Sequence, residues 1–321
     1  MTKIIAEIGF NHEGNLALAI EMIKAIAKAG AHAVKFQTYR ASDLALPSAP
    51  HYQAIQCGEM TLDQHKELAQ VSRDCGLDFL STPFSSWAVD ILEEVGVPAY
   101  KVASMDCTNK YLLGFLAETK KPIYLSTGMA TLDEIASTLN FLNEKRSGEV
   151  TLLHCMSLYP PKADDLNLNI IPFLKTVFGI PVGYSDHYPG IKACVAAVML
   201  GAEVIETHFT IDTKKEGADH HHSVDPDMLK QLITEVELFD KLKGNPNAIY
   251  SRPDRHFVND FRRGVYSARQ LKKSETIKEE DMLFCRPTSE LSPDDIDWFN
   301  GKMLSKDVPA YTAIHREMLK D

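Results

Sequence analysis

The sequence predicts a (β/α)8 barrel followed by a small, mainly β domain. A helix signal that ends in glycine and leads into a short apolar run recurs along the first three quarters of the chain, as in "KAGAHAVKFQT" and "MLGAEVIETHF". The runs are continuously apolar, which is typical of parallel strands covered on both faces. Eight such strands over about 240 residues fit a barrel of ~250 residues better than an open doubly wound sheet.

Each of the eight strands is expected at one apolar run. These runs are residues 4–8, 33–36, 79–81, 100–103, 123–125, 150–153, 182–184 and 204–209. The glycine-rich dinucleotide fingerprint is absent after the first run, which further disfavours a doubly wound fold.

The helices between the strands are predicted to be one-sided. Thr61 with Gln64, and Thr131 with Glu134, have the spacing of a capping box at a helix start. One face of the helix before Gly30 is expected to carry Leu16, Ile20, Ile23 and Ala27.

Domain boundaries follow from composition. We expect a barrel over residues 1–243, a linker over 244–261 that contains Pro246 and Pro253, and a small domain over 262–321. A domain of about 60 residues is marginally stable alone, so docking on the barrel or on another subunit is expected.

Overall composition excludes several classes of function. A formal net charge of −10 argues against nucleic-acid or anionic-membrane partners. No signal peptide or membrane-spanning run is found, and we expect a cytoplasmic protein. The six cysteines lack CxxC spacing and are expected to be free thiols.

Polar residues follow the predicted strands at the end where barrel enzymes hold their active sites. Lys35 and Lys101 can converge there with five hydroxyls on an oxyanion that carries phosphate and carboxylate groups. The hydroxyls belong to Thr82, Ser104, Ser126, Ser157 and Ser185. The alternative is that the lysines are solvated and the serines cap helices.

Two histidines end neighbouring strands and can approach one point. His187 and His208 follow strands seven and eight, and two imidazoles leave room for substrate and water on a catalytic divalent ion. The alternative is a pair of hydrogen-bonded structural histidines. Asp186, Glu206 and Asp219 are candidates for orienting these ligands or for contacting substrate hydroxyls.

Glu7 and a histidine run complete the candidate residues. Glu7 is either a base or hydroxyl ligand, or a structural carboxylate paired with a strand-end lysine. His220, His221 and His222 resemble a zinc cluster, but adjacent loop histidines cannot all face one ion. We therefore expect them to serve loop structure or substrate contact.

Nearly the whole chain resembles the sialic acid synthase (N-acetylneuraminate synthase) family, which condenses phosphoenolpyruvate with an N-acyl hexosamine to give nine-carbon acids. The resemblance rests on "AEIGFNHEGNLALAIEMIKAIAKAGAHAVKFQT", "STPFSS", "KVAS", "STGMATLDEI", "LLHC", "YPP", "VGYSDHYPG" and "ETHFTID...GADHHHSVDP".

The resemblance implies roles for individual residues. His187 and His208 would bind Mn²⁺ or Mg²⁺. The phosphoenolpyruvate contacts would be Lys35, Thr82, Lys101, Ser104, Ser126 and Ser185, with Ser157 at a position that is asparagine in some synthases. The acceptor-sugar contacts would be Gln37, Asp106, Tyr159, Asp219 and Arg286. Asp106 stands where the family can carry a glutamate.

The resemblance also covers the end of the chain. Residues from about Arg263 to Asp321 are similar to the antifreeze-like (SAF) domain, which in the family swaps onto the partner barrel of a homodimer. There Arg286 would reach the acceptor's N-acyl group. Departures occur here, since the family's "RPGxG" reads "RPTSE" and its "KKGE" turn reads "KKSE".

The implied reaction is that of a metal-dependent transferase. C3 of phosphoenolpyruvate attacks the open-chain sugar aldehyde, which the metal polarises, water adds at C2, and the tetrahedral intermediate loses phosphate. Glu7 or Asp219 would move a proton or activate water. N-acetylmannosamine, a diacetamido hexose and a phosphorylated mannosamine remain open as acceptors.

Two competing functions come from other classes. A metal-dependent barrel hydrolase needs a well-held water nucleophile and usually more ligands than two strand-end histidines. A saccharide-binding or antifreeze-like protein without catalysis would not need Lys35, Lys101, His187 or His208, and all four are present.

Overall fold

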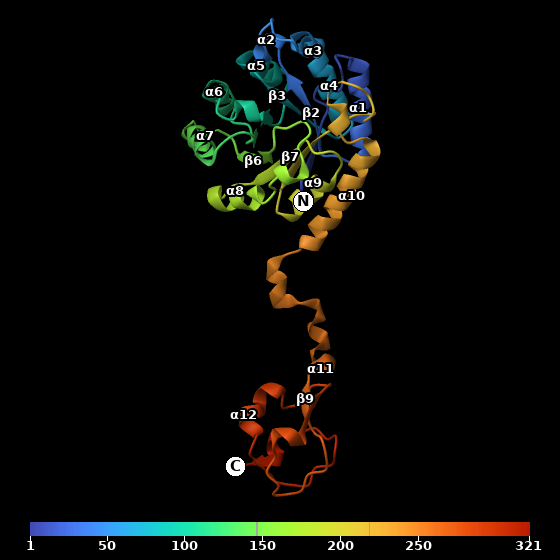
Figure 1. The fold of residues 1–321 in the computed structure, drawn as a ribbon, viewed down its shortest axis with the longest axis vertical. Coiled ribbons are helices and arrows are strands. Elements are labelled where there is room, and N and C mark those ends of the chain that lie inside the picture. The colour runs from blue at the N-terminus through green and yellow to red at the C-terminus, as the bar shows by residue number, and fades with distance from the viewer. Residues whose placement is uncertain (146, 218) are drawn as a thin grey trace. The chain divides into compact units, whose positions relative to one another are not determined.

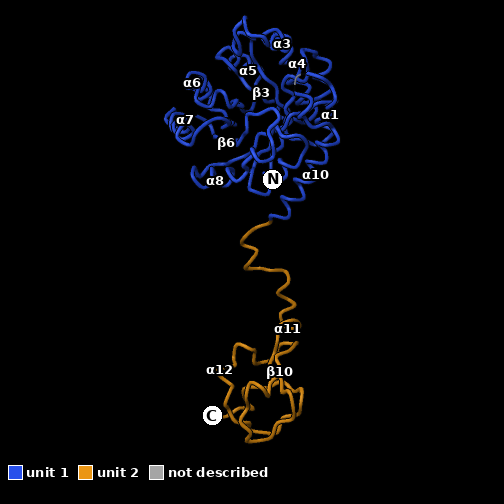
Figure 2. Tube along the Cα trace, in the orientation of Figure 1, with its two compact units in different colours: residues 1–243 blue, residues 244–321 orange. Residues whose placement is uncertain are grey.

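The chain forms two compact units, Met1–Lys243 and Gly244–Asp321, in a computed structural model that describes residues 1–145, 147–217 and 219–321. The first unit is a closed barrel of eight parallel strands in the order β1 to β8, with helices between successive strands (Figure 1). Figure 2 marks the division between the units. The predicted barrel is confirmed.

Every predicted strand is present, with ends within two residues of the expected positions. The strands are β1 (Lys3–Glu7), β2 (Ala33–Thr38), β3 (Asp78–Pro83), β4 (Tyr100–Val102), β5 (Ile123–Ser126), β6 (Val150–Cys155), β7 (Val182–Asp186) and β8 (Val204–His208). Pairing of β1 with β8 closes the barrel and sets Glu7 beside His208, while pairing with β2 sets it beside Lys35.

The helices of the first unit lie between successive strands or follow the last one. They are α1 (Leu16–Ala29), α2 (Ala41–Leu44), α3 (Tyr52–Cys57), α4 (Leu62–Asp74), α5 (Ser86–Val95), α6 (Lys110–Thr119), α7 (Leu132–Glu144), α8 (Ile170–Phe178), α9 (Lys192–Met199) and α10 (Pro226–Lys243). Both predicted capping boxes are confirmed, at the starts of α4 and α7. Among the described residues, no helix is long and apolar enough to span a bilayer.

The buried face of α1 differs from the predicted one. The fully buried residues are Ala19, Met22, Ile23 and Ile26. Of the predicted set only Ile23 is fully buried, while Leu16, Ile20 and Ala27 are half-buried at the sides of the same stripe. The helix is apolar over a broad arc, so periodicity alone did not fix which residues are at its centre.

The side chains inside the barrel form an apolar layer and a charged layer. Ile5 and Ala33 belong to a small apolar cluster within the barrel, and Glu7 and Lys35 lie two residues further along the same strands. Because strand side chains alternate between faces, residues two apart share a face. An apolar layer therefore fills the barrel below a layer of charged groups at its carboxyl end.

Gly183 in β7 leaves no room for a side chain. A Cβ there would lie 2.4 Å from the carbonyl oxygen of Val204 and 2.7 Å from the side chain of Leu153. We expect Gly183→Ala to lower the free energy of unfolding by about 2–4 kcal/mol, because backbone atoms must shift. Gly114→Ala in α6 is the matched control, since no atom lies within 4 Å and alanine favours a helix. Urea denaturation of both variants checks this, and equal stability would contradict it.

Buried histidines make stability depend on pH. Burial lowers the pKa of His12 to about 4, and the His12 Nδ1 accepts a hydrogen bond from the Gly14 amide. The unfolded chain takes up this proton at its ordinary pKa, so the stabilisation is complete above about pH 6.5 and is lost as the pH falls towards 4.

We expect His12→Gln to reduce this pH dependence. The free energy of unfolding of the wild type should lose about 2–3 kcal/mol to this one group between pH 7 and pH 4. Urea denaturation at pH 7.5, 5.5 and 4.5 measures it. If the variant lost stability as steeply as the wild type, His12 would not be the source.

The second unit is small and contains two two-stranded antiparallel sheets with short helical turns between them. It contains β9 (Gly264–Ser267) paired antiparallel with β10 (Met282–Cys285), β11 (Met303–Leu304) paired with β12 (Leu319–Lys320), and the short helices α11 (Val258–Phe261) and α12 (Ile296–Phe299). Its own core includes Val265, Leu271, Ile277, Leu291, Phe299 and Ile314. Residues 246–257 form short 3-10 turns. All six cysteines of the chain are free.

Candidate active site

A small polar cavity of about 70 Å³ lies at the carboxyl end of the barrel strands. It brings together most of the residues predicted from the sequence: Glu7, Lys35, Gln37, Thr82, Lys101, Ser104, Ser126, Tyr159, Ser185, His187 and His208. Cys155 and Glu206 also line it. We call this the inner cavity.

The two predicted lysines are buried in the inner cavity, which excludes solvated lysines. Lys35 is 2% exposed, and its Nζ lies 2.7 Å from Oε1 of Glu7 and donates a hydrogen bond of 3.0 Å to Thr82. Lys101 is 4% exposed, with Nζ 3.4 Å from Oε1 of Glu206. Each ammonium therefore has a carboxylate partner, as buried charges require.

Glu7 is held as a carboxylate. Burial alone would raise its pKa, but Lys35, His208 and Lys101 hold the pKa well below its ordinary value. Gln37 also donates a hydrogen bond of 2.9 Å to Oε1 of Glu7. Glu7 is therefore ionised at neutral pH, accepts hydrogen bonds and pairs with Lys35. This pairing with a lysine is one of the two roles expected from the sequence.

Several buried polar atoms around this cavity have no hydrogen-bond partner within the described part of the protein. They are Oγ of Ser126, Oγ of Ser157, Oε2 of Glu206 and Nδ1 of His208. Buried polar groups are almost always paired in native proteins, so such atoms mark places where a ligand makes contact.

A larger cavity of about 520 Å³ adjoins the inner one. The two share six lining residues: Gln37, Phe84, Ala103, Ser104, Tyr159 and His208. Ser157 and Asp219, both predicted site residues, line only the larger cavity. We call it the outer cavity. Its junction with the inner cavity is where two bound molecules would meet.

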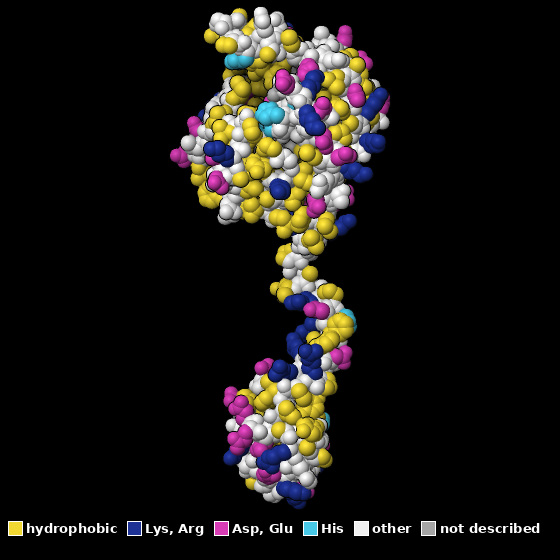
Figure 3. Space-filling view, turned by 45° about the vertical axis from the view of Figure 1, so that its right-hand side comes forward, with side chains coloured by type: hydrophobic (Ala, Val, Ile, Leu, Met, Phe, Trp, Pro, Cys, Tyr) yellow, Lys and Arg dark blue, Asp and Glu magenta, His cyan; other side chains and the backbone are white. Residues whose placement is uncertain are grey.

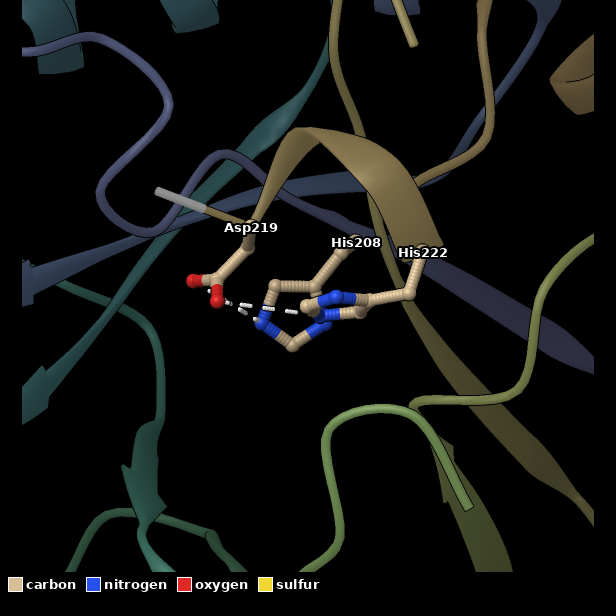
Figure 4. Close-up of side chains that lie close together, drawn as sticks. All are labelled: His208, Asp219 and His222. Atoms are coloured by element: carbon tan, nitrogen blue, oxygen red, sulfur yellow. Dashed lines mark ion pairs between the residues drawn. The ribbon is translucent and has the colours of Figure 1, made fainter. Parts of the chain in front are cut away.

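Three side chains form a candidate metal site at this junction (Figure 4). Nε2 of His208 lies 3.9 Å from Oδ2 of Asp219, and Nε2 of His222 lies 3.7 Å from Oδ1 of Asp219. One donor atom from each residue lies within 4.8 Å of the others. Burial lowers the pKa of His208 to about 4 and that of His222 to about 3, so both imidazoles are neutral at pH 7 and able to bind a metal.

His187 lies next to this group. Its ring centroid is 5.1 Å from that of His208, and its Nδ1 donates a hydrogen bond of 2.9 Å to the carbonyl of Met156. This bond leaves Nε2 of His187 free, which is the arrangement that orients many metal-binding histidines. The predicted neighbourhood of His187 and His208 is therefore present.

His222 lies in this group, although the sequence predicted a role in loop structure or substrate contact for it. The 3-10 helix His220–His222 places Asp219 and His222 on one side, because residues three apart share a face in such a turn. His220 instead contacts Thr210 and Glu13, as a structural loop residue does. The signal was the D-x-x-H spacing, which the repetition of histidines obscured.

Three predicted residues lie outside both cavities. Asp106 accepts a hydrogen bond of 2.8 Å from the side chain of Asn109, which caps α6. Asp186 accepts hydrogen bonds from the Tyr184 hydroxyl and the Tyr188 amide, a structural role. Arg286 belongs to the second unit, where its guanidinium lies 5.0 Å from the Phe261 ring. The acceptor contacts expected of Asp106 and Arg286 stay predictions.

Comparison with known proteins gives consistent matches. Residues 22–248 match the model of the NeuB family. The chain is 38% identical to the N,N'-diacetyllegionaminic acid synthase of Campylobacter jejuni, over 95% of this chain and 96% of that protein. It is 34% identical to the N-acetylneuraminate-9-phosphate synthase of Mus musculus, over 76% of this chain and 71% of that protein.

A solved structure agrees with these matches. The N-acetylneuraminic acid synthetase of Leptospira borgpetersenii superposes with a TM-score of 0.75 at 35% identity, over 79% of this chain and 92% of that one.

Proposed function

Because the chain belongs to the NeuB family, we propose that it is a nonulosonic acid synthase, a transferase that condenses phosphoenolpyruvate, an N-acyl hexosamine and water into a nine-carbon 2-keto acid and phosphate. The observation that carries the proposal is the inner cavity, in which two buried lysines face a set of buried hydroxyls. Such a cavity suits a small, highly charged anion.

Phosphoenolpyruvate is proposed to bind in the inner cavity. Lys35 and Lys101 supply the positive charge, while the hydroxyl groups donate to the phosphate and carboxylate oxygens. These hydroxyls belong to Thr82, Ser104, Ser126 and Ser185, with Ser157 at the junction with the outer cavity. The unpartnered Oγ atoms of Ser126 and Ser157 support this assignment.

The acceptor sugar is proposed to bind in the outer cavity. Gln37, Tyr159 and His208 line both cavities, so the aldehyde carbon of the acceptor would meet C3 of phosphoenolpyruvate beside them. Asp219 is a carboxyl group that lines the outer cavity and not the inner one. Burial raises the pKa of Asp219, which suits a group that passes a proton to or from the substrate.

A divalent ion fits the residues around His208. His208, Asp219 and His222 offer neutral imidazoles and a carboxylate, and the ring of His187 lies 5.1 Å from that of His208. A bound ion would supply Lewis acidity at the aldehyde oxygen. Mg²⁺ prefers oxygen ligands and rarely binds imidazole, so of the two ions that the resemblance implies we propose Mn²⁺.

The reaction proposed for these residues forms a C–C bond and breaks a C–O bond. C3 of phosphoenolpyruvate adds to the aldehyde, one water adds at C2, and the resulting tetrahedral carbon expels phosphate to leave the 2-keto acid. Lys35 and Lys101 stabilise the anionic groups throughout. Glu7, which is ionised, orients Lys35 and can accept a hydrogen bond from the water.

The second unit is proposed to act as an SAF domain in a domain-swapped homodimer, with Arg286 at the partner's acceptor. Mixing two inactive variants tests this. The Lys101→Ala variant has an impaired barrel and an intact second unit. The Arg286→Ala variant has an intact barrel and an impaired second unit. Joint refolding should restore about a quarter of wild-type activity, because half of the dimers are mixed and each has one complete site. No restoration would contradict the swap.

Phosphate release tests the proposed function as a whole. The full-length protein is incubated with phosphoenolpyruvate and Mn²⁺, with and without an N-acyl hexosamine, and the product mass is measured. Release that needs the acceptor, with a product mass of sugar plus pyruvate, is expected. Release with no acceptor and no condensed product would indicate the hydrolase alternative instead.

A further inference from the structure

The outer cavity has two chemically different sides. Ser157, Tyr159, His208 and Asp219 come from the strand ends and loops of β6 to β8 and form its polar side. Two further polar residues, Gln37 and Ser104, line the floor that the outer cavity shares with the inner one. The opposite side, which we call the apolar wall, comes from the segments after β1 to β5. It consists of Phe10, Leu44, Ile55, Phe84, Met105 and Met129. Hydrophobic side chains border a hollow on the face of the first unit in Figure 3.

The apolar wall is held in place by contacts behind it. The ring of Tyr39 lies 5.6 Å from that of Phe10 and 6.2 Å from that of Phe84, and its hydroxyl donates a hydrogen bond of 3.2 Å to the Ile55 carbonyl. A Cβ on Gly58 would lie 2.4 Å from this hydroxyl, so the chain passes closely around it. The part of the wall formed by Phe10, Ile55 and Phe84 is therefore held in place by the protein itself.

The charge of the cavity limits what it can accept. Within the described part of the chain, no lysine or arginine lines the outer cavity, and its charged group there is the Asp219 carboxylate. Both buried lysines lie in the inner cavity, where Glu7 and Glu206 already pair with them. A phosphate group turned towards the apolar wall would therefore lie against hydrophobic side chains that offer it no cation, away from the lysines of the inner cavity.

We propose that the acceptor is an uncharged amino sugar that turns methyl groups, from acetamido substituents and a deoxy C6, towards the apolar wall. This inference rests on the proposed function and selects among its acceptors. The hydroxyls and the aldehyde of such a sugar face the polar side, and the methyl groups bury apolar surface against Phe10, Leu44 and Phe84. A sugar 6-phosphate is excluded by the same arrangement.

Acceptor competition tests the inference. Phosphate release is measured at saturating phosphoenolpyruvate and Mn²⁺ with N-acetylmannosamine, its 6-phosphate, its 6-deoxy analogue and a 2,4-diacetamido-2,4,6-trideoxy hexose. Replacing a hydroxyl by hydrogen against the wall should raise kcat/KM about 10-fold. The 6-phosphate should be used at least about 100-fold less well than N-acetylmannosamine.

Two leucines two residues apart give a matched pair of variants. Leu44 is in the wall, whereas Leu46 is 74% exposed and lies outside the cavity. Leu44→Lys should raise kcat/KM for the 6-phosphate about 10-fold and lower that for the deoxy acceptors about 10-fold, because it adds a cation and removes apolar surface. Leu46→Lys should leave both values unchanged.

The outcomes separate this inference from the proposed function. Preferred use of the 6-phosphate, or equal effects of Leu44→Lys and Leu46→Lys, would overturn the acceptor inference while the synthase stands. Phosphoenolpyruvate binding is followed by calorimetry in the same samples. Failure to bind phosphoenolpyruvate, together with no phosphate release for any acceptor, would overturn the proposed function itself.

Discussion

Replacing Lys101 with methionine is expected to lower the affinity for phosphoenolpyruvate about 100-fold or more and kcat/KM about 1,000-fold. Lys101 is 4% exposed and reaches the inner cavity with its Nζ 3.4 Å from Glu206, so the variant leaves this cavity with one ammonium for a trianionic ligand. Calorimetric titration with phosphoenolpyruvate and initial-rate kinetics measure the two effects.

A double variant separates binding from folding. Lys101→Met leaves Glu206 buried with Lys35 3.8 Å away as its remaining cation, and this costs stability by itself. Lys101→Met/Glu206→Gln removes both charges and should restore the melting temperature without restoring affinity. Wild-type affinity in the double variant would show that Lys101 balances Glu206 and does not contact the ligand.

The barrel and its anion cavity could be predicted from the sequence because both depend on local patterns. Continuous apolar runs identify parallel strands, and a lysine that interrupts such a run shortly before polar strand-end residues points to the carboxyl end of the barrel. Lys35 and Lys101 were found in this way. The alternation of side chains along β2 then turns Lys35 inward, two residues after the buried Ala33.

The apolar wall and the position of His222 beside Asp219 could not be predicted in the same way. The wall gathers single residues from five segments, and none of them belongs to a periodic pattern. Leu44 and Ile55 lie in the short helices α2 and α3, and α3 has no buried residue that would give it an amphipathic signature. His222 acquires its position from the turn that follows Asp219, which depends on local backbone geometry.

Replacing His208 with alanine is expected to weaken Mn²⁺ binding at least about 100-fold and to lower turnover at least about 1,000-fold. Two sets of metal ligands are considered, His187 with His208 and His208 with Asp219 and His222. His208 belongs to both sets, because it lies beside His187 and beside the Asp219–His222 pair. Titration of Mn²⁺ followed by electron paramagnetic resonance measures the affinity without reference to activity.

Companion variants decide which residues complete the metal site. If the ion binds between His208, Asp219 and His222, then His222→Ala should weaken Mn²⁺ binding about 10- to 100-fold. His221→Ala is the matched control, because this neighbouring histidine is exposed and outside the group. Loss of affinity in His187→Ala but not in His222→Ala would instead support the His187–His208 pair. His222 would then be a buried neighbour of Asp219, with its Nε2 3.7 Å from Oδ1 of that carboxylate.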